Sequence, residues 1–579
     1  MDLEISLEFD NPNHLTSLMS EMNEARVESK FTDVTLCVDG TIFPCHKLVL
    51  ASSSEYFKGM FSSGMRESKE EKIHLRDVQS HAVELMLDYI YTGKAVITGS
   101  NLQALLEAAN MFQVLTLRDG CIKFMLENMD ASNCLGVWQM AESFSLAAAS
   151  EKALEYVINY FKLVSTQGEF LELTKEVLIK LVSNDLLCVE DEDLVGAAVI
   201  RWYEHCKGDD RNNREEDFVD VLEYLKLGEL SPNLYYDINC QLSDMKGVTK
   251  KTIENRPRLK DRKNKGSPKR LVSVVCSVGG FRRGWRYCRN VEYFDAVKKT
   301  WHRITQTPVI KDKNWEVEYA ATYDKYIITH VFRYPSMLNL ETREWELFDD
   351  KIYLHLRECQ SSKMIVLDNK LYFIGGEDRE NSHYVAIYGG FTCCDLVTRR
   401  EVQVPLLLKD GVFSSVVSFQ GKIYVFGGSV RSTHGDTYDS ISLIQCYNPN
   451  KKVWTCFDDI PPSVPREDTN AVVFDTLIYI FQNASKLYVY DPKQKEWQPP
   501  IAGFPEARYY KDCSATVCNC KIYIMGGRID RDDAHDDVYT NKMYCYDPIH
   551  SIWESNVGKL KTPLSISRVS QYTAPPTGL

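Results

Sequence analysis

The chain has 579 residues, is 44% hydrophobic and 26% charged, and carries a formal net charge of −13. This composition is ordinary for globular proteins, and the length predicts about three to four domains. The acidic balance disfavours sequence-independent binding to nucleic acid, and the strand-sized apolar runs and acidic N-terminus predict neither a transmembrane helix nor a signal peptide.

The first predicted element is an amphipathic helix over residues 14–29. It places Leu15, Leu18, Met19 and Met22 at helical spacing, so that one of its faces is apolar. Its own domain has little to cover this face, and we therefore expect another surface to bury it.

The hydrophobic period then changes from helix to strand and back again. Residues 33–38 and 41–43 are predicted strands, joined by Asp39-Gly40, a tight hairpin signal. The predicted helical segments that follow are residues 48–54, 83–91, 101–112 and 115–128. The N-terminal module is thus expected to be a small α/β domain.

A basic segment separates the two halves of the chain. Residues 246–270 contain 11 Lys and Arg against Glu254 and Asp261, together with Pro257 and Pro268, and have almost no apolar periodicity. This composition predicts a solvated linker, with a nuclear-import signal or an acidic-partner patch as the alternative.

The C-terminal half repeats a strand that ends in two glycines. Clear copies end at Gly280, Gly376, Gly428 and Gly527, and degenerate copies end at Val331 and Asn483. The mean interval of about 49 residues is that of kelch repeats. Six such units predict a six-bladed β-propeller.

The repeated residues are expected to be scaffold. A Tyr-Asp or related pair and then a Trp follow most copies, whereas the third copy has Asp395 and no Trp. Glycines allow close backbone approach, and one Trp per blade fills the wedge between sheets. Asn483 can adopt left-handed dihedrals, but Val331 is β-branched, so the second blade must turn differently.

The first repeat lacks the apolar strand that precedes the glycine-ended strand elsewhere. The C-terminal segment 564–572 can supply it and close the ring, removing exposed sheet edges.

The 18 Cys residues contain no Cys-x-x-Cys pair, and Cys393-Cys394 and Cys518-Asn-Cys520 have the wrong spacing for a zinc module. Most are therefore expected to be reduced core thiols, with redox sensing by any one of them as the alternative. No metal site, cofactor or catalytic residue is predicted.

Two sets of motifs resemble the domains of the kelch-like family. Phe31-Thr-Asp-Val34, Phe43-Pro-Cys-His-Lys47, Leu50-Ala-Ser-Ser-Ser-Glu-Tyr-Phe57, Met60-Phe61 and Tyr89-Ile-Tyr-Thr-Gly93 resemble a BTB domain. Asn133-Cys-Leu135, Phe170-Leu171, residues 178–192, Trp202 and Leu230-Ser-Pro232 resemble the all-helical BACK domain. The expected architecture is BTB (1–130), BACK (131–245), linker (246–270) and a six-bladed kelch propeller (271–579).

This resemblance implies a substrate adaptor of a cullin-3 RING ubiquitin ligase, itself not an enzyme. The BTB domain would form a homodimer through Leu15, Leu18, Met19 and Met22. The cullin would contact Met65, Arg66 and Glu67, which match the family's pattern of a hydrophobic residue, any residue and Glu. It would also contact Leu135 and Val137 in the first BACK helix. Asp33 and Lys47 match a charged pair that BTB domains hold near the dimer interface.

The substrate is expected to bind propeller loops that follow the glycine pairs or precede the apolar strands. The candidates are Phe281, Arg282, Arg283, Arg333, Glu377, Arg379, Arg431, Arg466, Tyr509, Tyr510, Lys511 and Arg528. Arginine and tyrosine recur among them, which suits an acidic degron.

The alternatives to the adaptor are a cytoskeletal scaffold and an enzyme. In the first, the kelch domain binds actin and the BTB domain only dimerises, making a cytoskeletal scaffold. In the second, the propeller is an enzyme like the copper oxidases with kelch-like blades, but the 12 scattered His provide no convincing metal or catalytic set. A BTB transcription factor is disfavoured because C2H2 zinc-finger spacing is missing. The expected location is the cytoplasm, with the nucleus or cytoskeleton as further possibilities.

Overall fold

The chain falls into two compact units in a computed structural model. One unit comprises residues 1–129 and 134–154, and the other comprises residues 130–133 and 155–579. The structure describes residues 11, 13–62, 70–205, 211–244, 272–278, 281–282, 286–296, 299–307, 317–323, 325–331, 334–347, 363–375, 377–378, 386–387, 390–409, 411–431, 438–511, 513–529, 538–554, 557–560 and 568–574. The predicted linker, residues 246–270, lies outside these ranges.

The first unit contains a three-stranded sheet in the order β2-β1-β3. β1 (Val34–Val38) and β2 (Thr41–Cys45) form the predicted hairpin, and Asp39 and Gly40 in its turn both have positive φ, 48° and 83°. Such angles are typical of a two-residue hairpin turn. β3 (Lys72–His74) pairs in parallel with β1. The sequence did not predict it, because three residues are too few to show an alternation.

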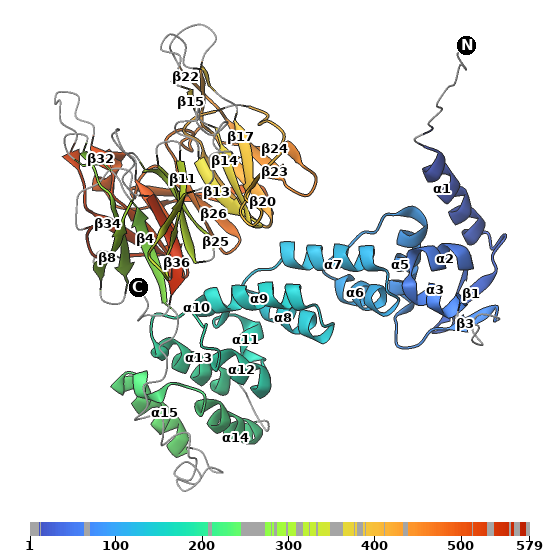
Figure 1. Ribbon diagram of the computed structural model, residues 1–579. Coiled ribbons are helices and arrows are strands. Elements are labelled where there is room, and N and C mark those ends of the chain that lie inside the picture. Colours follow the sequence, from blue (N-terminus) through green and yellow to red (C-terminus); the bar gives the residue numbers. More distant parts are fainter. Residues whose placement is uncertain are drawn as a thin grey trace, which may run out of the picture. The chain divides into compact units, whose positions relative to one another are not determined.

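Helices gather around the sheet of the first unit (Figure 1), and helices and sheet share one hydrophobic core. The helices are α1 (His14–Val27), α2 (Lys47–Ser53), α3 (Glu55–Ser62), α5 (Ser80–Thr92), α6 (Leu102–Met111), α7 (Leu115–Glu127) and α8 (Cys134–Ser143). The five predicted helices appear among them, with ends displaced by a few residues. Leu36, Leu50, Phe57, Leu87 and Leu105 are fully buried in this core.

The helical part of the second unit matches the expected all-α region. It follows α9 (Ala147–Asn159), which spans the boundary between the units. Its elements are α10 (Phe161–Val164), α11 (Gly168–Leu171), α12 (Lys175–Val182), α13 (Glu192–Glu204), α14 (Arg211–Leu222), η1 (Leu227–Glu229) and α15 (Pro232–Asp244). Trp202 is buried among them and donates its indole N–H to the Leu173 carbonyl at 2.8 Å, so a core polar group is satisfied.

Six four-stranded antiparallel sheets follow in the described residues, one for each predicted repeat (Figure 1). Sheets one to three consist of β36 (Arg568–Ala574), β4 (Val272–Val278), β7 (Asn290–Asp295), β8 (Thr300–Gln306); β9 (Val317–Tyr323), β10 (Tyr326–Val331), β11 (Tyr334–Asn339), β12 (Trp345–Leu347); and β13 (Lys363–Leu367), β14 (Lys370–Ile374), β17 (Phe391–Asp395), β18 (Arg400–Val402).

Sheets four to six have the same strand order as sheets two and three. They consist of β19 (Ser415–Phe419), β20 (Lys422–Phe426), β23 (Leu443–Asn448), β24 (Val453–Asp459); β25 (Asn470–Phe474), β26 (Leu477–Phe481), β27 (Lys486–Asp491), β28 (Glu496–Ala502); and β30 (Ser514–Cys518), β31 (Lys521–Met525), β34 (Met543–Asp547), β35 (Ile552–Glu554).

The C-terminal strand supplies the first strand of sheet one. β36 pairs antiparallel with β4, from Arg568 opposite Val278 to Ala574 opposite Val272. The predicted pairing of the tail with the first repeat is therefore confirmed. The first strands of successive sheets also contact one another, in the order β36, β9, β13, β19, β25, β30 and again β36.

The glycine pairs serve the close approach that their sequence suggested. At Gly427, φ is 59° and a Cβ atom would lie 2.3 Å from the Arg466 carbonyl oxygen. Gly428 donates its backbone N–H to the same oxygen at 2.6 Å. Any larger side chain at Gly427 would push apart the backbones of sheet four and the segment that leads into sheet five.

The two degenerate pairs achieve their turns by different means. Val331 remains in strand β10, where the pairing with β9 shifts register between His330 and Val331, so sheet two does turn differently. Asn483 does not use a left-handed φ. Its side-chain amide instead donates to the Tyr510 carbonyl at 3.1 Å and tethers the next loop.

The repeated Trp and Asp residues are structural. The indole N–H groups of Trp345 and Trp553 donate to backbone carbonyls of the preceding sheet, at Gln306 and Ala502, each at 2.9 Å. The Asp491 carboxylate accepts hydrogen bonds from the backbone N–H groups of Lys493 and Gln494, at 2.8 and 3.1 Å. Asn339, Asp395, Asn448 and Asp547 cap the equivalent turns in the same way. These bonds explain why the motif recurs.

Candidate protein-binding surfaces

No group of three or more His, Cys, Asp or Glu in the described residues could hold a metal ion. Among the described helices, none is both long and apolar enough to cross a bilayer. Burial raises the pKa of Cys121 and Cys393 to about 11 and that of Cys276 to about 12, and such thiols are poor nucleophiles at neutral pH.

The predicted cullin anchor, Met65, Arg66 and Glu67, lies outside the described residues. It falls between α3 and β3. The two further candidates lie on α8, where Leu135 is fully buried and Val137 is 9% exposed. Their side chains belong to the core in this conformation, which gives no support to a direct role for them in binding.

The first helix presents two of its four predicted interface residues to solvent. Leu15 is 73% exposed and Leu18 is 45% exposed, whereas Met19 and Met22 pack partly against the core of the first unit. The helix therefore anchors itself through the methionines and leaves the leucines uncovered. Isolated exposed leucines are common, but two on one helix face suit a partner surface.

The predicted Asp33 and Lys47 pair is joined through the backbone. An Asp33 carboxylate oxygen accepts the Lys47 backbone N–H at 2.7 Å, at the start of α2. Asp33 is exposed in the single chain, so the bond acts here as a turn contact.

Strand direction divides the six sheets into two ends. In an antiparallel four-stranded sheet, the turns after the first and third strands share one end, which we call the hairpin end. The connections after the second and fourth strands share the other, the loop end. All twelve substrate candidates belong to connections at the loop end.

Several of these candidates lie on short strands. Phe281 and Arg282 form β5 (Phe281–Arg282), Glu377 lies on β15 (Glu377–Asp378) and Arg431 lies on β21 (Ser429–Arg431). Three others lie outside the described residues: Arg283, Arg333 and Arg379.

The structure brings together the candidates of sheet six. β29 (Tyr510–Lys511) pairs with β32 (Arg528–Ile529), so that Lys511 lies opposite Arg528. Tyr509, at the end of the 3-10 helix η3 (Pro505–Tyr509), is 55% exposed. Lys542 lies over the ring of Tyr510, 5.7 Å from its centroid. Aromatic and cationic groups thus share one surface at the loop end.

Arg466 is engaged within the fold. Its Nη2 atom donates to the Ile460 carbonyl at 2.9 Å, and its own carbonyl contacts Gly427 and Gly428. It remains a candidate for substrate binding, but its position already has a structural role.

Several polar residues of the loop end are missing from the set predicted from the sequence. Glu467 accepts a bond from Ser440, and its carbonyl oxygen accepts one from Gln482 at 2.9 Å. Arg508 lies over the ring of Tyr509 at 4.6 Å. Of these residues, only Arg508 could have been found from the sequence, because it directly precedes the predicted residues Tyr509 and Tyr510. With Glu467 and Glu506 present, the described surface carries both signs of charge.

Comparison with known proteins agrees with the expected order of BTB, BACK and kelch domains. Family models match for the BTB/POZ domain (residues 22–129), for BTB And C-terminal Kelch (residues 134–238) and for the KLHDC2/KLHL20/DRC7 Kelch-repeats domain (residues 361–572).

The similar proteins span nearly the whole chain. Kelch-like protein 24 of Rattus norvegicus is 31% identical over 96% of this chain and 90% of its own length. Kelch repeat and BTB domain-containing protein 8 of Homo sapiens is 28% identical over 92% and 79%, and Kelch-like protein 25 of Xenopus tropicalis is 26% identical over 94% and 92%. The chain belongs to the kelch-like family of BTB-BACK-kelch proteins.

Proposed function

We propose that this protein is a substrate adaptor of a cullin-3 RING ubiquitin ligase. Kelch-like BTB proteins serve in general as adaptors of this kind, and the present chain has their BTB, BACK and kelch domains in order. The observation that carries the proposal is the conjunction of a BTB domain and a BACK domain with six four-stranded kelch-repeat sheets in one chain. The chain would hold its substrate, and the ligase chemistry would occur on other subunits.

The six sheets are proposed to form a closed six-bladed propeller. Two observations support it: β36 completes sheet one, and the first strands contact one another in a continuous cycle. In such a ring the first strands lie against one another, and only the outer fourth strand of each sheet remains as a short edge. The loop end then offers one continuous surface for a protein substrate.

The surface chemistry suggests how a substrate would bind. Tyr509, Tyr510, Lys511 and Arg528 combine aromatic area with positive charge, which suits an acidic segment with an apolar or aromatic anchor. An acidic degron remains part of the proposal, although Glu467 and Glu506 lie nearby and would disfavour indiscriminate binding of acidic chains. We further propose a homodimer through α1 and a cytoplasmic location.

The cullin anchor can be tested by co-purification from cells. Met65→Ala combined with Glu67→Ala should reduce cullin-3 recovery by at least about tenfold, because an apolar contact and a charge-assisted bond are both removed. Glu55→Ala is the matched control, because Glu55 is an exposed residue of the preceding helix α3, paired only with Lys58 in the described contacts at 2.9 Å.

Retained cullin binding by the double variant would show that the anchor is wrongly assigned. Failure of the unmodified chain to recover any cullin, together with co-sedimentation with actin filaments, would instead favour the cytoskeletal scaffold.

A further inference from the structure

The hairpin end of sheets five and six contacts the helical part of the same unit. The propeller residues that meet the helices lie in or beside a turn after a first or third strand: Phe474, Asp475, Lys493, Lys521 and Asp547. The candidate substrate residues all belong to the opposite end. The two functions of the repeat region, attachment and binding, are therefore separated along the strand direction.

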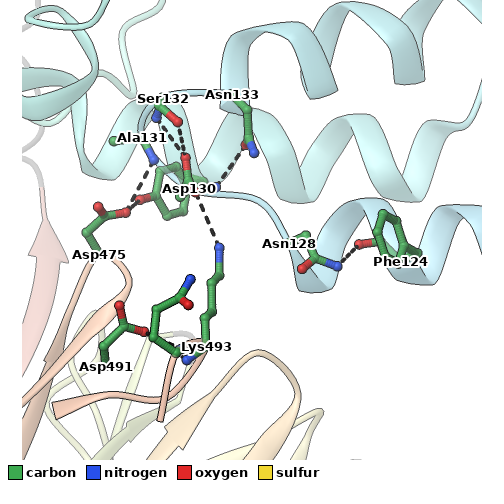
Figure 2. A network of polar contacts seen from close by, with 11 residues as sticks. Phe124, Asn128, Asp130, Ala131, Ser132, Asn133, Asp475, Asp491 and Lys493 are labelled. Atoms are coloured by element: carbon green, nitrogen blue, oxygen red, sulfur yellow. Dashed lines mark hydrogen bonds and ion pairs between the residues drawn. The ribbon is translucent and has the colours of Figure 1, made fainter. Parts of the chain in front are cut away.

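Asp475 is the centre of this contact (Figure 2). It occupies the turn between β25 and β26 with a φ of 53°. One of its carboxylate oxygens accepts the Ala131 backbone N–H at 3.2 Å and the Tyr156 hydroxyl at 2.5 Å. A single turn residue thus joins the segment before α8 to the end of α9, and hydrogen bonds to a charged acceptor are among the stronger ones.

A pair of opposite charges, Lys493 and Asp130, flanks Asp475. Lys493, in the turn between β27 and β28, lies 3.3 Å from Asp130. Burial by itself would raise the pKa of Asp130, but hydrogen bonds from Ser132 and the charge of Lys493 outweigh it and lower the pKa. Asp130 also receives a bond from the Ser132 hydroxyl at 2.5 Å (Figure 2), which fixes its carboxylate toward the propeller.

Sheet six repeats this arrangement with other residues. Lys162 of α10 lies 3.2 Å from Asp547, which caps the turn between β34 and β35 and is only 8% exposed at its side chain. Lys521, at the start of β31, lies 3.6 Å from Glu190 and 2.8 Å from Glu554. These ion pairs are largely shielded from water, so solvent screens them less than ordinary surface pairs.

Apolar side chains fill the space between the polar contacts. Tyr160 and Leu163 pack against the core cluster of sheets five and six. The ring of Tyr160 meets that of Phe474 edge to face, with centroids 6.1 Å apart, and stacks on Tyr156 at 4.7 Å. Removing Tyr160 from water favours association of the helices with sheets five and six. The polar bonds therefore need only select how these two surfaces are oriented.

We propose that these contacts lock the propeller to the BACK helices as one rigid body, and that Asp475 is the positioning residue that sets its orientation. The lock leaves the loop end open and fixes the direction in which it faces relative to α9 and α10. This inference concerns the fold and stands whether or not the chain recruits a cullin.

The test is hydrogen exchange on the full-length protein, compared between two glycine variants. Asp475→Gly keeps the positive φ of the turn and removes the carboxylate. Asp368→Gly is the matched control, because Asp368 occupies the same position in the turn between β13 and β14, with a φ of 49°, on a sheet that contributes none of these contacts.

Asp475→Gly should accelerate amide exchange in residues 155–164 by at least about tenfold. These residues are distant in the sequence, since Tyr156 and Asp475 are 319 positions apart. Asp368→Gly should leave that segment unchanged. Asp475→Asn, which keeps an acceptor oxygen, should restore most of the protection.

A double variant identifies the bond. Tyr156→Phe removes the hydroxyl and keeps the ring, so it should accelerate exchange in the same segment by itself and add little in the Asp475→Gly background. If Asp475→Gly and Asp368→Gly give the same exchange pattern, or if Tyr156→Phe and Asp475→Gly are fully additive, the lock through Asp475 is rejected.

Discussion

At the residue scale, position in the repeat decides what a given residue type does. Gly421 and Gly427 both lie in sheet four and have similar φ angles, 69° and 59°. A Cβ atom at Gly421 would meet nothing within 4 Å, whereas one at Gly427 would meet the Arg466 carbonyl oxygen at 2.3 Å. The first glycine serves only its own turn, and the second also allows two backbones to touch.

This difference predicts unequal costs for the same substitution. Gly421→Ala should lower the free energy of unfolding by about 1 kcal/mol, because alanine is strained at positive φ. Gly427→Ala should cost at least about 2 kcal/mol more, because the neighbouring backbone must also move. Urea unfolding of the two variants measures both values, and equal costs would contradict the close approach.

At the element scale, the C-terminal strand is expected to stabilise the whole repeat region. Removing residues 568–579 would leave β4 without its partner β36 and open the edge of sheet one. We expect a loss of more than about 4 kcal/mol or failure to fold, measured by thermal unfolding. Deletion of residues 575–579 alone, beyond the end of β36, is the control and should leave the melting temperature unchanged.

The first helix is the second element with a specific prediction. Leu15→Glu combined with Leu18→Glu should weaken self-association at least about 100-fold, because charges would be placed in an apolar interface. Thr16→Glu, at an exposed position of the same helix, should leave the dimer intact. Light scattering coupled to size exclusion measures the mass. A leucine variant that remains dimeric would move the interface away from this face.

At the scale of the whole molecule, the two ends of the repeat sheets have different tasks. The hairpin end carries Asp475, Lys493 and Asp547, which contact the helical part of the unit. The loop end carries the candidate substrate residues. The sequence predicts the Tyr-Asp motif only as scaffold, yet Asp547 both caps its turn and accepts a hydrogen bond from Lys162. One scaffold position thus also serves attachment.

The sequence by itself determined the elements and their order. Helical periodicity, the Asp39-Gly40 turn and the repeat of about 49 residues identified most elements of residues 1–130 and the repeat sheets, because each is a local pattern with a local physical cause. The helices of residues 131–245 were expected only from the resemblance to BACK domains. The residues 72–74 of β3 were too few to leave such a pattern. The motif at Met65 and Glu67 could be named only by resemblance, since a short loop has no periodicity.

Only the tertiary structure decided which residues act together. Leu135 and Arg466 are both predicted binding residues; the structure places Leu135 in the core, and Arg466 donates to the Ile460 carbonyl. Asp475 gave no signal beyond a turn, because its partner Tyr156 is 319 residues away. Contacts of this kind depend on how the sheets and helices meet, and no local pattern in the chain records that geometry.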